Sequence, residues 1–382
     1  MKKRVVLIRS NPVSPDPPVE KMASTLLKEG YIVTIIGWDR ETNYPLTKDK
    51  VTLSGHSVDV VRFGIKAQFG GGIKKNLMPL LKFQKSIRRW LVKNKSEYDI
   101  IHAFDFDTGL VASKYAKKFN KKLVYHILDY YADSHRLRGT AFEKAILKLE
   151  NSIIDFADAT VICTEKRKEQ IVGSNPKNLV VIHNTPQKIP FSQDFKLQMH
   201  CGNDNRKKID YVGILDEGRF IRELIEFVKH QEQLELHIGC FGPLGSEIEQ
   251  IAKANSNIFY FGRLPYPSTL ALEEQCDLMV AIYDPSIPNH QYAAPNKFYE
   301  SIMLGKPIIM AKNTGFDDII MQNEIGCCIN YTDRGLADGI AFLLDNVDKW
   351  ESMGNRGKAL YNDSFSWDVM EKRIKDMYGN IE

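Results

Sequence analysis

The residues best suited to chemistry lie in one stretch of the chain, residues 291–310, which reads QYAAPNKFYESIMLGKPIIM. The pattern predicts a loop, a short helix and a strand, because Pro295 fits the first helical position and Gly305 a left-handed terminator, before an apolar run at 308–311. The first turn of such a helix offers free backbone N–H groups and a partial positive charge, and Lys297 adds a full charge there. We therefore expect this turn to bind an anion such as a diphosphate.

Two polar side chains extend this predicted site. Asn296 stands at the start of the helix, and Glu300 follows about one turn later, so its carboxylate can accept hydrogen bonds from the hydroxyls of a bound ribose or hexose. The alternative is a surface glutamate on a capped helix. The run from Pro295 to Ile309 resembles the donor-nucleotide signature of GT-B fold glycosyltransferases similar to family 4 (group 1).

This resemblance covers nearly the whole chain and is strongest over residues 209–311. It implies an α/β chain with two Rossmann-like domains facing a cleft, a retaining reaction and a catalytic role for Glu300 beside donor binding. One departure concerns the two glutamates, separated by seven residues, that many retaining relatives carry. Glu300 matches the second of them, but Tyr292 stands at the first, where its hydroxyl can donate a hydrogen bond and cannot supply a negative charge.

Composition places the chain among ordinary globular proteins. Its 382 residues are 43% hydrophobic and 26% charged, enough for two domains, and a net charge of +4 does not by itself indicate nucleic-acid binding. The six cysteines form no Cys-x-x-Cys pair, which favours a reducing cytoplasm. The apolar run that begins at Val5 is short and ends at Arg9, so it predicts a first strand rather than a signal peptide, and no run reaches the ~20 apolar residues of a membrane span.

Short apolar runs alternate with helical stretches through the first half of the chain. This alternation predicts right-handed crossovers and a parallel sheet, with ligands bound at the carboxyl ends of the strands. The predicted strands are residues 5–8, 31–36, 58–63, 100–103, 123–127, 160–163 and 179–182. The proline-rich loop after the first of them, with a helix predicted from Met22 to Glu29, has no Gly-x-Gly-x-x-Gly turn and so argues against a dinucleotide oxidoreductase.

Asp129 is the first-half candidate for the reacting centre. It ends the run Val124–Asp129, where many relatives carry His-Asp and this chain has Leu128-Asp129. The carboxylate could contact a sugar or acceptor hydroxyl, or act as a base if burial raises its pKa. A helix N-cap or turn aspartate is the alternative. His102 lies inside a predicted strand, where a buried and satisfied histidine is expected.

A basic amphipathic segment occupies residues 73–95. Its apolar residues fall at helical spacing (Leu80, Phe83, Ile87, Trp90 and Leu91), and lysines and arginines cover the rest. One hypothesis is that the helix lies on an anionic membrane that holds a lipid-linked acceptor, with Trp90 at the level of the headgroups. The alternative is a helix whose apolar stripe faces the core and whose basic face is solvated.

The second half supplies the other donor-site candidates, each after a predicted strand. Gly213 would let a ligand approach the backbone, and Arg219 could bind diphosphate oxygens bidentately or form a surface ion pair. Gly242 and Arg263 follow the next two strands, where the spacing resembles the base pocket of the family; Arg263 could stack on the base or face solvent.

These observations predict an acceptor domain at 1–186, a linker at 187–208, a donor domain at 209–360 and a returning helix at 361–382. The resemblance implies a hexosyltransferase, metal-independent and without a cofactor, whose donor is a nucleoside-diphosphate sugar, with UDP favoured over GDP. Its acceptor would be a glycan or lipid-linked molecule in cell-envelope polysaccharide synthesis, at the cytoplasmic face of a membrane. The rivals are a sugar-nucleotide epimerase or hydrolase of the same fold and a non-enzymatic two-domain binding protein.

Overall fold

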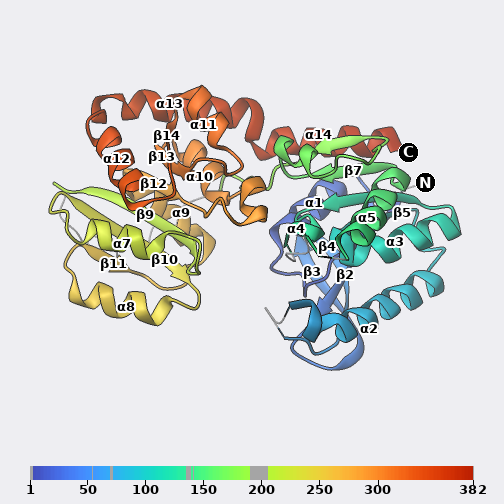
Figure 1. Ribbon diagram of the computed structural model, residues 1–382. Coiled ribbons are helices and arrows are strands. Elements are labelled where there is room, and N and C mark those ends of the chain that lie inside the picture. The colour runs from blue at the N-terminus through green and yellow to red at the C-terminus, as the bar shows by residue number, and fades with distance from the viewer. Residues whose placement is uncertain are drawn as a thin grey trace. The chain divides into compact units, whose positions relative to one another are not determined.

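The structure is a computed structural model that describes residues 3–53, 55–68, 72–134, 139–140, 142–189 and 205–381, without the side chains of 72–74. The chain forms two compact units, which we treat separately. Unit 1 comprises Met1–His183 and Met370–Glu382, and unit 2 comprises Asn184–Val369 (Figure 1). Residues 190–204 of the predicted linker lie outside the described residues.

Unit 1 is built on an eight-stranded sheet in the order β3-β4-β2-β1-β5-β6-β7-β8. Every pair in it is parallel except β3 with β4. Each predicted apolar run overlaps one of these strands. Their bounds are β1 (Arg4–Ile8), β2 (Ile32–Asp39), β3 (Tyr44–Leu53), β4 (His56–Gly64), β5 (Ile100–Phe104), β6 (Lys122–Ile127), β7 (Ala159–Ile162) and β8 (Leu179–Val181).

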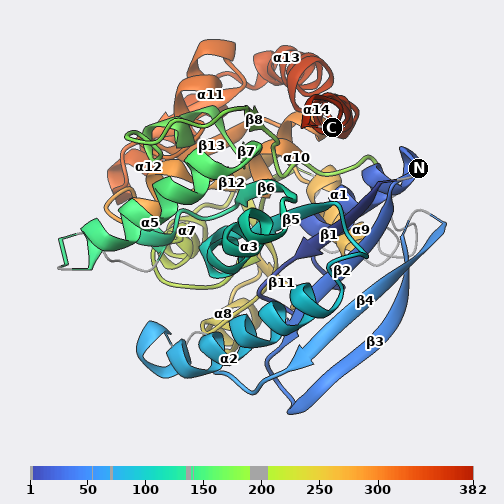
Figure 2. The ribbon, with the colours of Figure 1, turned by 90° about the vertical axis from the view of Figure 1, so that its right-hand side faces the viewer.

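Strand β3 corrects the prediction of a wholly parallel sheet in this unit. It pairs antiparallel with β4 at the edge of the sheet, where Figure 2 shows the two long strands side by side. No apolar run predicts β3, because none of its residues is buried and an edge strand need not carry an apolar side.

Helix α1 (Pro17–Lys28) begins five residues before the predicted start at Met22. Two of the prolines that suggested a loop occupy its first positions, where the missing N–H costs no hydrogen bond. The Asp16 side chain caps the helix by accepting from the Val19 backbone N–H at 3.4 Å. The other helices of this unit are α2 (Gly72–Lys93), α3 (Asp105–Phe119), α4 (Tyr131–Ser134), α5 (Glu143–Phe156) and most of α14 (Trp367–Ile381).

The apolar stripe of α2 faces the core of unit 1. Phe83, Ile87 and Leu91 are fully buried, and Phe83 stacks on Trp38 with ring centroids 4.9 Å apart. Trp90 is partly buried and packs beside Tyr98, so its expected place at the level of membrane headgroups is wrong. The helix matches the alternative, with its apolar stripe packed on the core and its basic face in solvent. The sheet of unit 1 provides the apolar surface against which the stripe packs.

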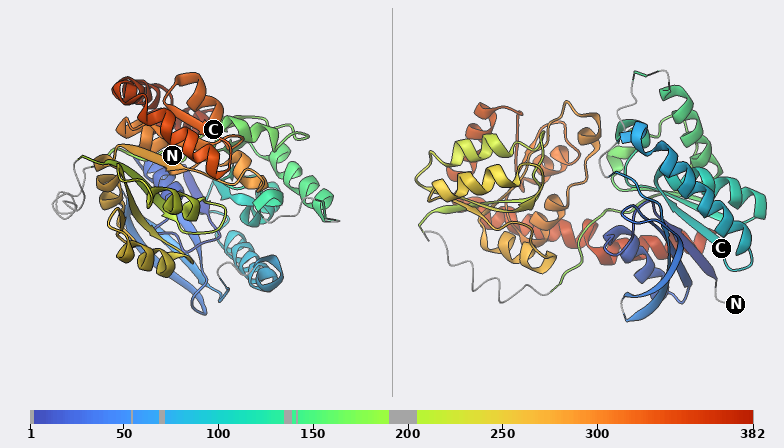
Figure 3. Two further views of the ribbon diagram at one scale, coloured as in Figure 1. Left: turned by 60° about the vertical axis from the view of Figure 1, so that its left-hand side comes forward. Right: turned by 90° about the horizontal axis from the view of Figure 1, so that it is seen from below.

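Unit 2 is built on a six-stranded parallel sheet in the order β11-β10-β9-β12-β13-β14. Its strands are β9 (Lys207–Ile214), β10 (Leu234–Phe241), β11 (Ile258–Tyr260), β12 (Leu278–Ala281), β13 (Ile308–Ala311) and β14 (Gly326–Ile329). Its helices are α7 (Ile221–Val228), α8 (Gly245–Ala254), α9 (Tyr266–Gln275), α10 (Asn296–Leu304), α11 (Asp317–Asn323), α12 (Asp333–Leu344) and α13 (Trp350–Leu360). In the right-hand view of Figure 3, α7 and α8 cover one face of this sheet and α9 the other.

Helix α14 is bound into unit 1 through polar contacts. Tyr378 meets the Nδ1 atom of His102 at 2.8 Å, and Arg373 donates to the backbone carbonyl of Val181 at 2.9 Å. Glu371 forms an ion pair with Lys28 at 2.6 Å. Within the described ranges, no helix combines the length and apolar character that a bilayer crossing requires.

Candidate functional site

The carboxyl edge of the unit 2 sheet gathers the residues predicted for the donor. Strands β10, β9 and β12 are neighbours and parallel, so their carboxyl ends lie at one edge. Gly213 lies near the end of β9, Gly242 directly follows β10, and the loop after β12 leads into α10. A Cβ atom at Gly242 would lie 2.4 Å from the Leu215 carbonyl oxygen, so only glycine lets the two loops pack together.

Lys297 lies in the first turn of α10 and reaches the end of β9. Its side chain is only 8% exposed, and its Nζ atom lies 5.3 Å from the centre of the Tyr211 ring. A Cβ atom at Gly213 would approach that Nζ to 2.4 Å, and Gly213 has a φ of +140°. The missing side chain of Gly213 therefore makes room for the ammonium group. Helix α10 ends as predicted, at Gly305 in the left-handed conformation.

Two arginines at the same edge stack on aromatic rings. The Arg219 guanidinium lies 4.0 Å from the ring centre of Tyr283, in the loop after β12, and Arg263 lies 4.6 Å from that of Phe241, at the end of β10. Stacking of this kind holds the planar group in place and leaves its N–H edges available to an acceptor. Arg263 and Phe241 are both exposed and present a flat surface to solvent.

Asn296 and Glu300 diverge from the start of α10. Asn296 is exposed and accepts a hydrogen bond from the Asn184 side chain at 3.3 Å. Glu300 is only 3% exposed and turns toward α9, where its carboxylate is hydrogen-bonded to the Tyr266 hydroxyl. The expected partner of Glu300 was a sugar hydroxyl; in the structure its neighbours are protein groups.

Two buried acids that the sequence prediction overlooked lie behind Lys297. Asp210 of β9 and Glu273 of α9 are both fully buried. Burial raises the pKa of Asp210 to about 8, with the Lys297 charge lowering it and the Glu300 charge raising it. Burial likewise raises the pKa of Glu273, and the Glu300 carboxylate adds to the rise. The overlooked signal was an aspartate inside the apolar run of β9, where a charged residue requires an explanation.

The carboxyl edge of the unit 1 sheet carries a row of paired charges. Arg9 follows β1, Asp105 follows β5, Asp129 follows β6 and Arg167 follows β7, and these four strands are neighbours. Arg9 forms ion pairs with Asp105 and, at 3.0 Å, with Asp16. Burial opposes the charge of Arg9, but the two carboxylates outweigh it and raise its pKa. Neither Arg9 nor Arg167 was among the site residues predicted from the sequence.

Asp129 is the most exposed member of this row, with 56% of its side chain accessible. Its carboxylate lies 3.4 Å from a guanidinium nitrogen of the buried Arg167, and its backbone N–H donates to the Asp105 carboxylate at 3.2 Å. Asp105, which binds this turn, has a left-handed backbone conformation with a φ of +60°. This conformation is strained for a residue with a Cβ. The Asp129 carboxylate is thus accessible from solvent, where a sugar hydroxyl could donate to it.

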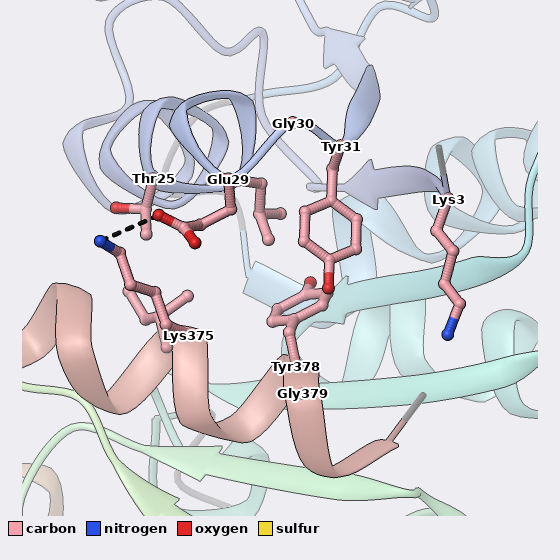
Figure 4. Close-up of a pocket in the computed structure, with 10 residues that line it drawn as sticks. Lys3, Thr25, Glu29, Gly30, Tyr31, Lys375, Tyr378 and Gly379 are labelled. Carbon is pink, nitrogen blue, oxygen red and sulfur yellow. Dashed lines mark ion pairs between the residues drawn. The ribbon is translucent and has the colours of Figure 1, made fainter. Parts of the chain in front are cut away.

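A cavity in unit 1 lies at the opposite, amino-terminal edge of its sheet. It measures about 540 Å³ and is lined by α1, the starts of β1 and β2, and α14 (Figure 4). Figure 4 shows the rings of Tyr31 and Tyr378 meeting within it, beside the ion pair of Glu29 with Lys375 at 2.9 Å. Ligands of parallel α/β sheets bind at the carboxyl edge, so we assign this cavity to the anchoring of α14.

His102 has the structural role expected of it. It is fully buried, and its Nε2 atom lies 3.2 Å from Nδ1 of His126 while Nδ1 contacts Tyr378. Burial lowers the pKa of His102 to about 3, so the imidazole is neutral at physiological pH. In the part of the chain that the structure describes, no group of three or more His, Cys, Asp or Glu residues is arranged to hold a metal ion.

Comparison with solved structures shows the same fold over the full chain. Sucrose-phosphate synthase from Thermosynechococcus elongatus is similar with a TM-score of 0.75 and 16% identity, covering 100% of this chain and 99% of that one. HepE from Anabaena in complex with UDP-glucose gives a TM-score of 0.70 at 14% identity, with coverage of 98% and 99%. The catalytic domain of starch synthase IV from Arabidopsis thaliana bound to ADP and acarbose gives 0.68 at 14% identity, with coverage of 100% and 99%.

Family models match both halves of the sequence. The model described as Glycosyltransferase Family 4 matches residues 19–185, and the model described as Glycosyl transferases group 1 matches residues 206–346. A comparison with curated proteins gave no match. The two models together span most of the chain, and both units have the Rossmann-like architecture that the solved GT-B structures share. The chain therefore belongs to the GT-B glycosyltransferases, with a family 4 first half and a group 1 second half.

Proposed function

We propose that this enzyme transfers a hexose from a nucleoside-diphosphate sugar to a glycan or lipid-linked acceptor in polysaccharide synthesis at the cytoplasmic face of a membrane. The observation that carries the proposal is the position of Lys297. Its ammonium group lies in the first turn of α10, against the Gly213 backbone, at the carboxyl edge of the unit 2 sheet. The helix dipole and the lysine charge together favour a diphosphate at this point.

The chemistry proposed for this edge is stabilisation of the departing nucleoside diphosphate. Negative charge develops on the leaving phosphate oxygens as the bond to the sugar breaks. Lys297, Arg219 and the first backbone N–H groups of α10 are the donors available to that charge, without a bound metal or an added cofactor. A nucleotide base would lie along the exposed surface of Arg263 and Phe241, and the loop at Gly242 would border it. Retention of configuration follows the family resemblance.

Asp129 is the group proposed to orient the sugar or acceptor in unit 1. Its exposed carboxylate, steadied by Arg167 and by Asp105 through the backbone, would accept a hydrogen bond from a hydroxyl. We favour UDP as the nucleotide, because the solved relatives include HepE in complex with UDP-glucose.

The donor proposal is tested by thermal-shift measurements with UDP, GDP, ADP, CMP and dTDP. One nucleoside diphosphate should raise the melting temperature of the native enzyme and fail to raise that of Lys297→Ala. Lys253→Ala is the matched control, because Lys253 lies on α8 of the same unit and its side chain is exposed in an ion pair with Glu249. If none of the five nucleotides shifts the native enzyme, the proposed function is wrong.

Membrane docking is proposed through a different face of α2 from the one that the sequence suggested. Leu77, Met78 and Leu81 are exposed, by 47%, 63% and 47%, in the first half of the helix. The cations of α2 that follow them are also exposed (Lys82, Lys85, Arg88, Arg89 and Lys93). Apolar side chains beside a basic surface are suited to an anionic bilayer, which is where a lipid-linked acceptor would be found.

Co-sedimentation with liposomes at low salt tests the docking proposal. The native enzyme should sediment with vesicles of mixed neutral and anionic lipid and remain in solution with neutral vesicles alone. The triple variant Leu77→Ser, Met78→Ser, Leu81→Ser should lose this binding. Phe342→Ser removes a side chain that is exposed to a similar degree on α12 of unit 2, and should keep it. Equal sedimentation of the two variants would contradict docking through α2.

A further inference from the structure

We propose that Asp210 and Glu273, together with Glu300, form a buried carboxyl cluster that takes up a proton when a nucleoside diphosphate binds beside Lys297. Asp210 and Glu273 are thereby positioning residues that set how much positive charge Lys297 presents to the donor. This inference rests on the proposed function, since it places the diphosphate at the first turn of α10. It adds a group of residues that acts through Lys297 without touching the substrate.

The cluster is assembled from three elements. Asp210 lies in β9 opposite Met279 of β12, and residues opposite each other on parallel strands point to the same face of the sheet. Met279 packs against Phe298 and Ile302 of α10, so the Asp210 side chain is on the face that α10 covers. Helix α9, which carries Glu273, packs on β9 and on α10. The Glu273 carboxyl group lies next to that of Glu300.

The carboxyl group of Asp210 has no hydrogen-bond partner for either oxygen among the described residues. An ionised carboxylate in such a place loses its hydration without compensation, which is costly enough that the group holds a proton instead. The neighbouring acid groups of Glu273 and Glu300 add repulsion to any further negative charge. The cluster is therefore poised between a protonated form and an ionised form.

Among the charged groups around Asp210, Lys297 is the one whose charge a bound diphosphate would engage. Lys297 and Lys306 both favour the ionised form of Asp210, and the Lys306 ammonium is already held by the Glu274 carbonyl at 2.7 Å. His237, opposite Asp210 on β10, has its pKa lowered by burial and is hydrogen-bonded with Glu235 at 3.2 Å. Burial also raises the pKa of the thiols of Cys240 and Cys276, which stay uncharged.

The sign of the linkage follows from these charges. When Asp210 is protonated, the positive charge of Lys297 is available to a diphosphate. When Asp210 is ionised, its negative charge offsets that of Lys297 and repels the ligand. A bound diphosphate therefore raises the affinity of the cluster for its proton, and nucleotide affinity must fall as pH rises through the pKa of the free cluster, which for Asp210 is about 8.

Isothermal titration calorimetry with UDP on the full chain measures this proton directly. Titrations at pH 8 in HEPES and in Tris, whose ionisation enthalpies differ, give the number of protons taken up per UDP bound. At pH 8 about half of the free cluster is already protonated, so we expect uptake of up to about half a proton per UDP, little uptake at pH 6.5, and a dissociation constant that rises by up to about tenfold per pH unit above pH 8. The terminal phosphate of UDP is already ionised there, since its pKa is about 6, so it does not contribute.

Two neutral variants and one control complete the test. Asp210→Asn keeps the size of the side chain and removes its titration, so UDP should bind with less proton uptake and with an affinity that is flat between pH 7 and pH 9. Glu273→Gln should also reduce the uptake, and it provides the same reading if Asp210→Asn fails to fold. Glu249→Gln, on the exposed face of α8, should leave proton uptake and pH dependence unchanged.

The outcomes separate the two proposals. UDP binding with equal heats in the two buffers, after correction for dilution, overturns the carboxyl cluster and leaves the proposed function standing. Proton uptake that persists in both Asp210→Asn and Glu273→Gln overturns the assignment to these residues. Absence of binding by UDP and by the other nucleoside diphosphates overturns the proposed function and this inference with it.

Discussion

The two sheet edges at which parallel strands end are prepared for ligands in opposite ways. In unit 1 the edge is lined by charges that already have partners, such as Arg9 with Asp105 and Arg167 with Asp129. In unit 2 the corresponding edge is lined by glycines and by Lys297, whose ammonium lies against a ring and a backbone turn. The paired edge has little net charge to attract an anion, whereas the glycine edge combines a cation with a helix start.

This difference explains why one architecture can serve two kinds of ligand. A neutral row of charged groups offers hydrogen bonds in fixed directions, as neutral sugar hydroxyls require. An open backbone with one buried lysine offers charge and close approach, which suit a diphosphate. Function therefore depends on which side chains follow each strand rather than on the shared sheet.

Removal of the Lys297 side chain should have the largest effect on activity. In Lys297→Ala the glycine edge loses its buried cation and keeps Arg219 and Arg263, and we expect kcat/KM to fall by about 10²–10³-fold, as for removal of one charge-stabilising donor. Steady-state kinetics with the donor identified by thermal shift measures this loss. Lys253→Ala should retain native kinetics. A variant at Lys297 with native activity would remove this edge from the mechanism.

Neutralising Asp129 tests the paired edge in the same way. Asp129→Asn keeps the shape of the side chain and weakens its acceptance of a hydroxyl proton, so we expect turnover to fall by about 10²-fold while nucleotide binding stays near native. Kinetics and the nucleotide thermal shift, measured together, separate the two effects. Asp155→Asn replaces an aspartate on α5, away from the carboxyl edge, and serves as control. Unchanged turnover would exclude Asp129 from the reaction.

Adding one methyl group sharpens the claim that glycine makes room for the lysine. In Gly213→Ala the new Cβ would lie 2.4 Å from Lys297 Nζ at a φ of +140°, so we expect both weaker nucleotide binding and a loss of stability of about 1–3 kcal/mol. Gly55→Ala is the matched control, since Gly55 also has positive φ, +77°, but nothing within 4 Å of the added atom. Urea denaturation should show a loss in both variants, and the nucleotide thermal shift a loss in Gly213→Ala alone.

The smallest expected effect concerns Glu150, which is a buried acid of unit 1 as Asp210 is of unit 2. Burial raises its pKa to about 8, and the Tyr125 hydroxyl donates to it at 2.8 Å. Because the folded state holds this proton more tightly than the unfolded state, its contribution to stability is complete below pH 4.5 and is lost as pH rises toward 8.

Glu150→Gln removes that dependence. Relative to the native enzyme, we expect the variant to gain stability with rising pH, by about 1 kcal/mol for each pH unit between pH 5 and pH 7. Urea denaturation across that range measures the gain, with Glu143→Gln, at the start of the same helix, as control. A constant difference between variant and native enzyme would show that Glu150 does not hold its proton on folding.

Helix α10 shows how much of the candidate site could be predicted from the local sequence. The bounds of α10, its left-handed end at Gly305 and the strand that follows were predicted within one or two residues, because they depend on proline and glycine preferences and on an apolar run. The side-chain directions were not predicted. The hydrogen bond of Glu300 with Tyr266 was not predicted, because its partner lies on α9, a helix 25 residues or more away in the chain.

The α/β class, the positions of the buried strands, helix α10 and the resemblance to glycosyltransferases could therefore be predicted from the sequence, because each depends on local composition and spacing. Which strands are neighbours depends on the tertiary structure. So do the pairing of Arg9 with Asp105, 96 residues apart, and the proximity of Asp210, Glu273 and Glu300. The tertiary structure also turned the stripe of α2 toward the core and added β3 at the edge. Burial and charge contacts between distant segments depend on strand order, and no local pattern carries that information.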